Sequence, residues 1–452
     1  MAKTKVAYVC SACGANHTSW AGRCSACGAW NTLEQQIDVR GGTKTEQALA
    51  SGNVLKPVSL DVKASKPTGR LSVGIADIDE VLGGGVVPGS VVLIAGQPGI
   101  GKSTLLLQLA YNAAKNVNVL YVSGEESPEQ VSLRGKRLQA EHQNLHLVSS
   151  TSANDIAATI ATDAYDLVIV DSIQTIAAAE ITGVPGSVSQ VTNSTQLLTV
   201  AAKQVKTALI LVGHVTKEGS IAGPKVLEHA VDVVLQLEGD RYGGFRVLRC
   251  IKNRFGSTNE AAILEMVDTG LKVVDNPSAA LLAERQLCDG SIVLATLEGT
   301  RPILVEVQAL VNTTSYGYPK RAAAGIDINR LNLLVAMLER RTKLKLADKD
   351  IYINIVGGMK ITEPAADLAI CMAIASAAKG MQLKTDAVVF GEVGLSGEIR
   401  HVPWADKRLA EAKKLGFTDA IGPTVRGDKA PAWLHQMRDV RSALNTFLAK
   451  ED

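Results

Sequence analysis

The segment of residues 96–103, GQPGIGKS, constrains this chain more than any other feature. It follows the apolar run SVVLIAG and precedes the helical pattern KSTLLLQLAYNAAKN. The segment fits GxxxxGK[ST], in which glycines let backbone N–H groups surround phosphates at a helix N-terminus. A strand, this loop and a helix in that order predict a nucleotide-binding α/β domain.

This loop predicts an ATP and Mg²⁺ site. We expect Lys102 to reach the β- and γ-phosphates of ATP, and the Ser103 hydroxyl to coordinate Mg²⁺. The expected ATP-binding residues are Gly96, Gln97, Pro98, Gly99, Ile100, Gly101, Lys102, Ser103 and Thr104.

Two later apolar strands end in acidic residues. We expect these acids to lie near the same loop, because α/β sheets bind their ligands at the carboxyl ends of parallel strands. YDLVIVDS ends in Asp171, which we expect to hold Mg²⁺, and VNVLYVSG runs into Glu125 and Glu126. We assign Glu125 as the base for the attacking water and Glu126 as a supporting or capping acid. His214, at the end of TALILVGHV, is either a γ-phosphate sensor or a structural histidine.

Two CxxC pairs near the N-terminus predict a zinc site. Cys10, Cys13, Cys24 and Cys27 form two knuckles separated by ten residues. Four thiolates in this spacing bind one tetrahedral Zn²⁺, whereas disulfides are disfavoured in a reducing compartment. A closed four-Cys site is structural, and so short a segment depends on its metal for stability.

Three further side chains of this head have two interpretations. Trp20, Arg23 and Trp30 either contact nucleic acid by stacking or simply cover the small domain.

The pattern along the 452 residues predicts four segments. Residues 1–34 form the four-Cys zinc finger, and 35–65 a polar linker without periodicity. Residues 66–275 alternate strands and helices, which predicts a mostly parallel sheet. Residues 276–452 form a second α/β pattern with a hairpin around Gly299 and a long helix.

Composition excludes some classes and leaves others open. Hydrophobic residues make up 46% and charged residues 20%, so large cores are expected. The N-terminus lacks an apolar signal-peptide region, and no apolar run reaches the ~18 residues of a membrane span. We therefore expect a cytoplasmic protein without membrane contact. The net charge of +2 neither indicates nor excludes nucleic-acid binding.

Longer motifs extend beyond a generic nucleotide-binding domain. The segments LGGGVVPGSVVLIAGQPGIGKST, YVSGEES and VIVDSIQT resemble RecA-like ATPases, and residues 252–256 read KNRFG. With the four-Cys head, these motifs are similar to the RadA (Sms) family of bacterial DNA repair proteins. The resemblance implies a RecA-like core and a Lon-protease-like C-terminal α/β domain. It also implies a DNA-dependent ATPase and helicase, hexameric and acting with the RecA recombinase, that drives branch migration on single-stranded and branched DNA.

The resemblance implies further site residues. Lys252 and Arg254 of KNRFG match a catalytic role in the ATP site of a neighbouring protomer, with DNA contact or a solvated surface as alternatives. Two segments match the DNA loops of RecA, namely residues 177–195 and 216–225. In the second, Lys217 and Lys225 join Lys252 and Arg254 as expected DNA-binding residues.

The C-terminal domain raises the alternative of proteolysis. Lon proteases use a Ser–Lys dyad, but Ala365 falls at the serine position and Ala405 at the lysine position. If the match to the lysine motif shifts in register, Lys407 takes the lysine position instead. The dyad would still lack its nucleophilic serine. We therefore expect an inactive scaffold that holds a ring together.

Two basic clusters of this domain either touch DNA phosphates or are solvated helix faces. They comprise Arg340, Arg341, Lys343 and Lys345, and then Lys407, Arg408, Lys413 and Lys414. Besides the protease, the remaining alternative function is a regulatory ATPase that switches a protein partner.

Overall fold

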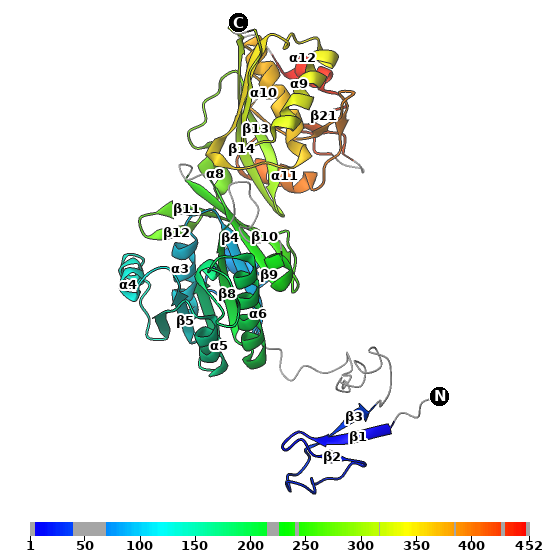
Figure 1. Cartoon of the computed structure of the whole chain (residues 1–452). Helices are drawn as coiled ribbons and strands as arrows, with labels where there is room; N and C mark the ends of the chain where they lie inside the picture. The colour runs from blue at the N-terminus through cyan, green and yellow to red at the C-terminus, as the bar shows by residue number, and fades with distance from the viewer. Residues whose placement is uncertain are drawn as a thin grey trace. The chain divides into compact units, whose positions relative to one another are not determined.

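The computed structural model describes residues 5–38, 69–214, 226–239, 244–315, 317–383, 386–425 and 430–448. The chain divides into two compact units, Met1–Pro67 and Thr68–Asp452 (Figure 1). Most of the expected linker lies outside the described residues, as do Lys217 and Lys225.

The first unit contains a three-stranded antiparallel sheet in the order β2-β1-β3. Its strands are β1 (Lys5–Cys10), β2 (Asn16–His17) and β3 (Leu33–Asp38). Its buried cluster consists of Cys10, Cys24 and Leu33. So small an apolar cluster leaves the head dependent on a metal, as the sequence predicted.

The first α/β part of the second unit is built on a nine-stranded sheet in the order β12-β11-β10-β9-β4-β8-β7-β5-β6. Six strands are parallel: β4 (Val91–Gly96), β5 (Val119–Ser123), β6 (Leu145–Ser149), β7 (Leu167–Asp171), β8 (Ala208–His214) and β9 (Val233–Glu238). Three antiparallel strands extend one edge: β10 (Phe245–Asn253), β11 (Ala261–Val267) and β12 (Gly270–Val273). The mostly parallel sheet is confirmed, and its central strands are apolar because helices cover both faces.

Helices on the two faces separate two apolar clusters. On one face lie α3 (Lys102–Ala114), α4 (Pro128–Arg137) and α2 (Ala76–Val81), and on the other α5 (Ala153–Ala161) and α6 (Val188–Val205) (Figure 1). The short α7 (Val226–Ala230) precedes β9. The capping box Ser127–Gln130 begins α4 directly after the two glutamates.

The C-terminal domain has a seven-stranded sheet in the order β15-β16-β14-β13-β17-β20-β21. Its strands are β13 (Ser291–Glu298), β14 (Arg301–Thr313), β15 (Arg321–Ala324), β16 (Lys349–Ile355), β17 (Ala387–Val389), β20 (Asp419–Pro423) and β21 (Leu434–Met437). Its helices are α8 (Pro277–Leu282), α9 (Ile328–Thr342), α10 (Asp367–Lys379), α11 (Ala405–Lys414) and α12 (Val440–Phe447). The hairpin expected around Gly299 is the β13–β14 turn, and the expected long helix is α9.

That hairpin packs against the first α/β part. A Cβ on Gly299 would lie 1.9 Å from the carbonyl oxygen of Asn259, so only glycine fits there. Arg301 donates to Asp77 at 3.0 Å, and Arg249 of β10 forms an ion pair with Glu298 at the end of β13. These contacts join the two α/β parts within one compact unit.

Candidate functional site

The phosphate-binding loop connects the end of β4 to the start of α3. Gly99 and Gly101 adopt positive φ values of 78° and 114°, which only glycine adopts without strain. A Cβ on Gly96 would lie 2.8 Å from the carbonyl oxygen of Leu237 on the next strand. The loop therefore needs its glycines for conformation and for space, and it leads into a helix N-terminus suited to anions.

Lys102 lies at the centre of this loop. Its Nζ donates to the carbonyl oxygens of Gly96 at 2.8 Å and Gln97 at 3.1 Å, and lies 3.1 Å from Nδ1 of His214. Burial lowers the pKa of Lys102 to about 8, against the opposing influence of Asp171 and Glu125. A buried cation in a concave loop is suited to pairing with phosphate oxygens.

The two adjacent glutamates have different surroundings. Oε1 of Glu125 accepts a hydrogen bond from the Ser172 hydroxyl at 2.6 Å and lies 3.6 Å from Nε2 of His214. Glu126 instead forms an ion pair with Arg134 of α4. Only Glu125 therefore makes contacts with residues at the ends of β7 and β8.

Asp171 ends β7 and accepts a hydrogen bond from the Tyr121 hydroxyl at 2.7 Å through Oδ2. Burial raises the pKa of Tyr121, so this phenol stays protonated and donates. The register pairs Ser123 with Asp171, and Gly96 with His214. Lys102, Glu125, Asp171 and His214 thus meet at the carboxyl edge of the sheet, where α/β sheets bind their ligands.

Sequence reasoning missed two members of this site, Tyr121 and Ser172. Tyr121 is a polar-tipped ring within an otherwise apolar strand, and Ser172 directly follows the predicted metal-binding acid. Both residues lie within the segments YVSGEES and VIVDSIQT, but only the acidic residues of these segments were assigned a role.

Lys252 and Arg254 lie away from this edge. In the register, Lys252 of β10 pairs with Val234 and Asn253 with Val233, near the amino end of β9. Val233 in turn pairs with Val92 of β4. Since β4 has six residues, the two edges are separated by roughly 17 Å of strand. KNRFG therefore does not join the phosphate-binding loop of its own chain.

Both basic residues contact the segment that leads into β9. Nζ of Lys252 donates to the carbonyl oxygens of Glu228 at 2.6 Å and Val231 at 2.8 Å. Nη1 of Arg254 lies 3.0 Å from Oδ1 of the buried Asp232, and its side chain is half exposed. The Arg254 guanidinium can therefore leave Asp232 and pair with another anion. The Lys252 ammonium leaves its two carbonyl oxygens less readily.

The first expected DNA loop is shorter than predicted. Residues 188–195 belong to α6, because the Ser187 side chain accepts from the backbone N–H of Gln190 and begins the helix there. The remaining loop is held by the Gln190 side chain, which donates to Ile181 at 2.6 Å and accepts from Ala178 N at 2.9 Å. Val184, at its tip, is exposed.

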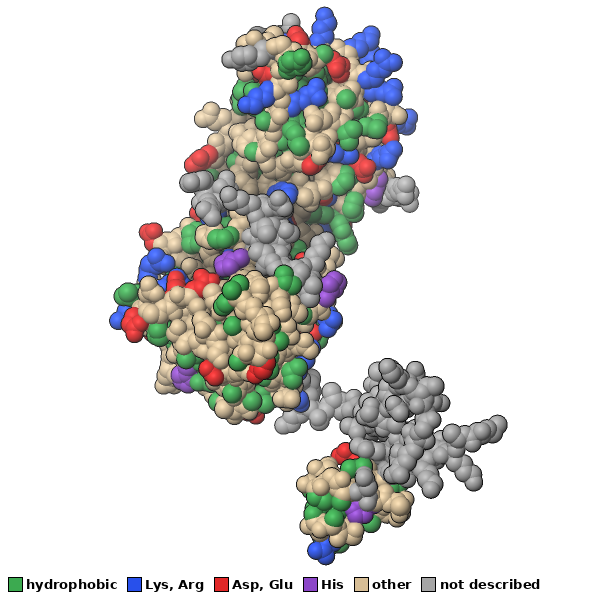
Figure 2. Space-filling model, viewed as in Figure 1, with side chains coloured by type: hydrophobic (Ala, Val, Ile, Leu, Met, Phe, Trp, Pro, Cys, Tyr) green, Lys and Arg blue, Asp and Glu red, His purple; other side chains and the backbone are tan. Residues whose placement is uncertain are grey.

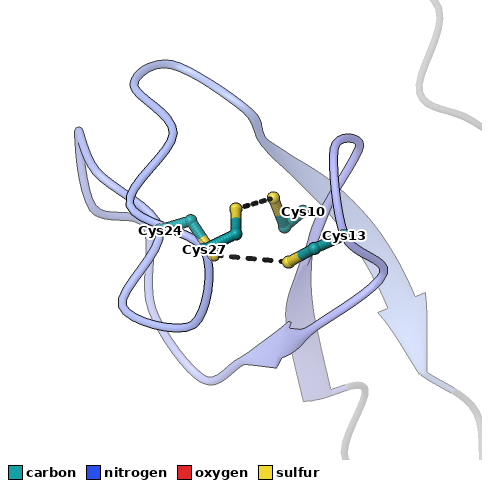
Figure 3. Close-up of side chains that lie close together, drawn as sticks. All are labelled: Cys10, Cys13, Cys24 and Cys27. Carbon is teal, nitrogen blue, oxygen red and sulfur yellow. Dashed lines mark hydrogen bonds between the residues drawn. The ribbon is translucent and has the colours of Figure 1, made fainter.

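The four head cysteines converge on one point (Figure 3). Their sulfur atoms all lie within 4.8 Å of one another, with 3.6 Å between Cys10 and Cys27 and 3.8 Å between Cys13 and Cys24. Tetrahedral thiolates at 2.3 Å from Zn²⁺ are about 3.8 Å apart, so the donor set fits zinc. A hydrogen bond from the Cys27 backbone lowers the pKa of Cys24 to about 6, which favours the thiolate.

Trp20 and Trp30 lie on the surface of the head, where they are 60% and 70% exposed. The guanidinium of Arg23 lies 5.7 Å from the centre of the Trp30 ring.

In the C-terminal domain, the two alanines at the expected dyad positions are buried. Ala365 and Ala405 belong to one apolar cluster that also contains Phe390. Beside it, Arg408 donates to both carboxylate oxygens of Glu363, at 2.9 and 2.6 Å. Nζ of Lys407 lies 4.5 Å from the Trp404 ring.

The expected second basic cluster requires a correction. Arg408 is fully buried in its ion pair with Glu363, so it cannot touch DNA. The four basic residues at the end of α9 are all exposed. Figure 2 shows Lys and Arg side chains gathered along one side of the C-terminal domain.

Among the described residues, no helix combines the length and the apolar character that a membrane span requires.

Three family models match separate parts of the chain. The model of the AAA domain matches residues 60–220, that of the rubredoxin metal binding domain matches 8–35, and that of subunit ChlI of Mg-chelatase matches 329–425. Among solved structures, the RadB recombinase aligns with 45% of this chain and 100% of its own, at 22% identity and a TM-score of 0.36.

Curated relatives match almost the whole chain. The DNA repair protein RadA of Pseudomonas aeruginosa is 48% identical over 96% of each chain. That of Bacillus subtilis is 47% identical over 95% of this chain and 94% of its own. The resemblance that the sequence motifs indicated is confirmed: the chain belongs to the RadA family of DNA repair proteins.

Proposed function

We propose that the chain is a DNA-dependent ATPase that hydrolyses ATP with Mg²⁺ and drives branch migration of recombination intermediates. The observation that carries ATP hydrolysis is the meeting of Lys102, Glu125, Asp171 and His214 at the carboxyl edge of the sheet. The DNA-dependent part of the proposal is supported by membership of the RadA family of DNA repair proteins. A cation for phosphates, an acid for a metal and a second acid for water are the groups that phosphoryl transfer requires.

Within this site, the residues divide the work. Residues 96–104 hold the phosphates, Lys102 compensates their charge, and Ser103 with Asp171 holds Mg²⁺. Tyr121 fixes the Asp171 carboxylate by its hydrogen bond. Mg²⁺, when bound, would supply positive charge that compensates the charge developing on the phosphates.

Glu125 is the proposed base. It accepts a hydrogen bond from Ser172 and lies 3.6 Å from Nε2 of His214, whose Nδ1 lies 3.1 Å from Nζ of Lys102. The His214 ring therefore lies between the proposed base and the phosphate-binding cation. His214 can therefore report the presence of a γ-phosphate to Glu125. Glu126, paired with Arg134, serves the local structure of α4.

Lys252 and Arg254 are proposed to complete the site of a neighbouring protomer. Their place at the opposite edge of the sheet favours a role between subunits, since a cis role would need to bridge roughly 17 Å. A ring, with a hexamer as the expected form, brings the amino edge of one core to the carboxyl edge of the next. A basic side chain arriving there stabilises charge on the transferred phosphoryl group.

The DNA would lie in the ring and contact the loop of residues 177–187 together with Lys217 and Lys225. We expect single-stranded and branched DNA as substrates and the RecA recombinase as partner. Phosphate contacts by small residues and lysines make binding salt-sensitive and largely independent of sequence. The C-terminal domain serves as a scaffold without peptidase activity, because neither alanine of the apolar cluster supplies a nucleophile or a base.

The first test is steady-state ATP hydrolysis with and without single-stranded DNA, for the wild type, Lys102→Ala, Lys252→Ala and the control Lys136→Ala. Lys136 is an exposed lysine of α4. We expect strong stimulation by DNA that Lys102→Ala abolishes, Lys252→Ala impairs and Lys136→Ala preserves. Hydrolysis indifferent to DNA would instead favour a regulatory ATPase.

Mixed rings test the composite site. Neither Lys102→Ala nor Lys252→Ala protomers hydrolyse ATP well alone, but mixtures place an intact loop beside an intact KNRFG. Recovery of activity on mixing supports a site shared between subunits, and its absence in mixed rings of verified composition contradicts it. Strand-exchange substrates with RecA then measure branch migration directly.

A further inference from the structure

Trp20, Arg23 and Trp30 form an exposed surface on the head, which we call the tryptophan platform. Both rings present most of their area to solvent, although the head has only a small apolar cluster of its own. Two large aromatic rings exposed beside the same residue form a contiguous apolar patch, and such patches mark interaction sites. The four cysteines close the metal site and leave no open position, so the head acts through its surface.

The platform is held in shape by the second zinc knuckle. Arg23 and Trp30 face each other in an antiparallel bridge, and the backbone N–H of Asn31 donates to Gly22 at 2.9 Å. Nε of Arg23 donates to the carbonyl oxygen of Gly28 at 2.9 Å. The three side chains are therefore presented together by one short hairpin.

Both rings lie next to Gly22. A Cβ built on Gly22 would lie 3.9 Å from Cζ3 of Trp30 and 4.0 Å from Cη2 of Trp20. The rings thus flank one small residue, with a cation beside one of them. A larger residue at position 22 would occupy space next to both rings.

The charge of the platform selects the ligand. Within the described part of the chain, no carboxylate forms an ion pair with Arg23, and its guanidinium lies beside the face of Trp30. Aromatic faces for bases together with a cation for phosphate are the combination that binds single strands without sequence preference. A purely apolar partner would leave the guanidinium without a counter-charge.

We propose that the tryptophan platform binds single-stranded DNA, with bases stacked on Trp20 and Trp30 and a phosphate contacted by Arg23. This inference rests on the proposed DNA-dependent function and adds a second DNA contact, outside the ATPase core. The head then acts as a binding module for the single strand rather than as a mere structural appendage.

The test measures the affinity of the full-length protein for fluorescent oligo(dT). Trp20→Ala and Trp30→Ala are each expected to weaken binding about tenfold, the order observed for a lost base stack. Trp20→Phe and Trp30→Phe retain a stacking face and keep most of the affinity. The matched control is Tyr318→Ala, which removes an aromatic ring that is 90% exposed on the C-terminal domain and leaves affinity unchanged.

Two further measurements separate stacking from charge. An abasic oligomer has the same phosphates without bases, so the tryptophan variants and the wild type should bind it equally. Arg23→Gln should instead reduce the slope of log affinity against log salt by about 0.7, as expected for one lost phosphate contact on a single strand. The zinc content of each variant, measured as one ion per chain, verifies that the head is folded.

The outcomes distinguish this inference from the proposed function. A wild type that fails to bind oligo(dT) overturns both. A wild type that binds, with Trp20→Ala/Trp30→Ala binding equally well and retaining zinc, overturns only the platform and assigns its rings to a protein partner. Equal losses on oligo(dT) and on the abasic oligomer also overturn base stacking.

Discussion

The Ser172 hydroxyl donates to Oε1 of Glu125 at 2.6 Å and so turns this carboxylate toward the ends of the central strands. Its neighbour in sequence, Glu126, pairs with Arg134 instead. We expect Glu125→Gln to reduce ATP turnover by about 10²-fold or more, the usual contribution of a general base, with nucleotide binding retained. Single-turnover hydrolysis and nucleotide binding measure the two effects.

The matched control for this prediction is Glu126→Gln, which makes the same chemical change one residue away. It should lower turnover by only a few-fold, because it removes an ion pair with Arg134 of α4 and leaves Glu125, Ser172 and His214 unchanged. A larger loss in Glu126→Gln than in Glu125→Gln would reverse the assignment of the base.

Nucleotide binding should take up protons near pH 8. Burial lowers the pKa of Lys102 to about 8, and a bound phosphate favours the ammonium and raises this pKa. At pH values between the pKa of Lys102 in the free protein and its higher pKa in the complex, nucleotide binding is therefore accompanied by proton uptake. The affinity for nucleotide falls as the pH rises through about 8. Calorimetry in two buffers of different ionisation enthalpy measures this uptake. In Lys102→Arg, which stays charged, the uptake should disappear.

Removal of zinc should unfold the head. Cys24→Ser or a strong chelator removes a ligand or the metal from a unit whose buried cluster is too small to fold alone. Limited proteolysis should then cleave within residues 5–38, and metal analysis should fall below one zinc per chain. His17→Ala is the control: His17 lies 3.4 Å from Cys24 Sγ, but four thiolates already complete the tetrahedron. Loss of zinc in His17→Ala would contradict the four-Cys assignment.

The buried ion pair of the C-terminal domain should contribute strongly to its stability. Arg408→Ala leaves the Glu363 carboxylate mostly buried without its partner, which costs about 3–5 kcal/mol in the free energy of unfolding. Chemical denaturation measures the change. The double variant Arg408→Met/Glu363→Leu should recover part of the loss, whereas Lys407→Ala should change stability by less than about 0.5 kcal/mol. A neutral Arg408→Ala would show that the pair is dispensable.

Features carried by neighbouring residues were predictable. The phosphate-binding loop depends on glycines and on a helix start within nine consecutive residues, and the zinc ligands lie in two short hairpins. The apolar runs of β4, β7 and β8 indicated a parallel sheet covered on both faces, because such strands are buried throughout. These elements are specified locally, so the sequence by itself determined them.

Tertiary contacts decided the remainder, because they join residues far apart in the chain. Glu125 and Glu126 are adjacent and chemically identical, so the sequence does not distinguish their roles. Their orientations differ because Glu125 accepts a hydrogen bond from Ser172, whereas Glu126 pairs with Arg134. The place of KNRFG at the opposite edge from Gly96 follows from strand order and register. Arg408 appeared to belong to an exposed basic cluster, yet a partner 45 residues away holds it in the interior. Burial and pairing of charges depend on which surfaces meet, and that is decided only when the sheets and helices pack together.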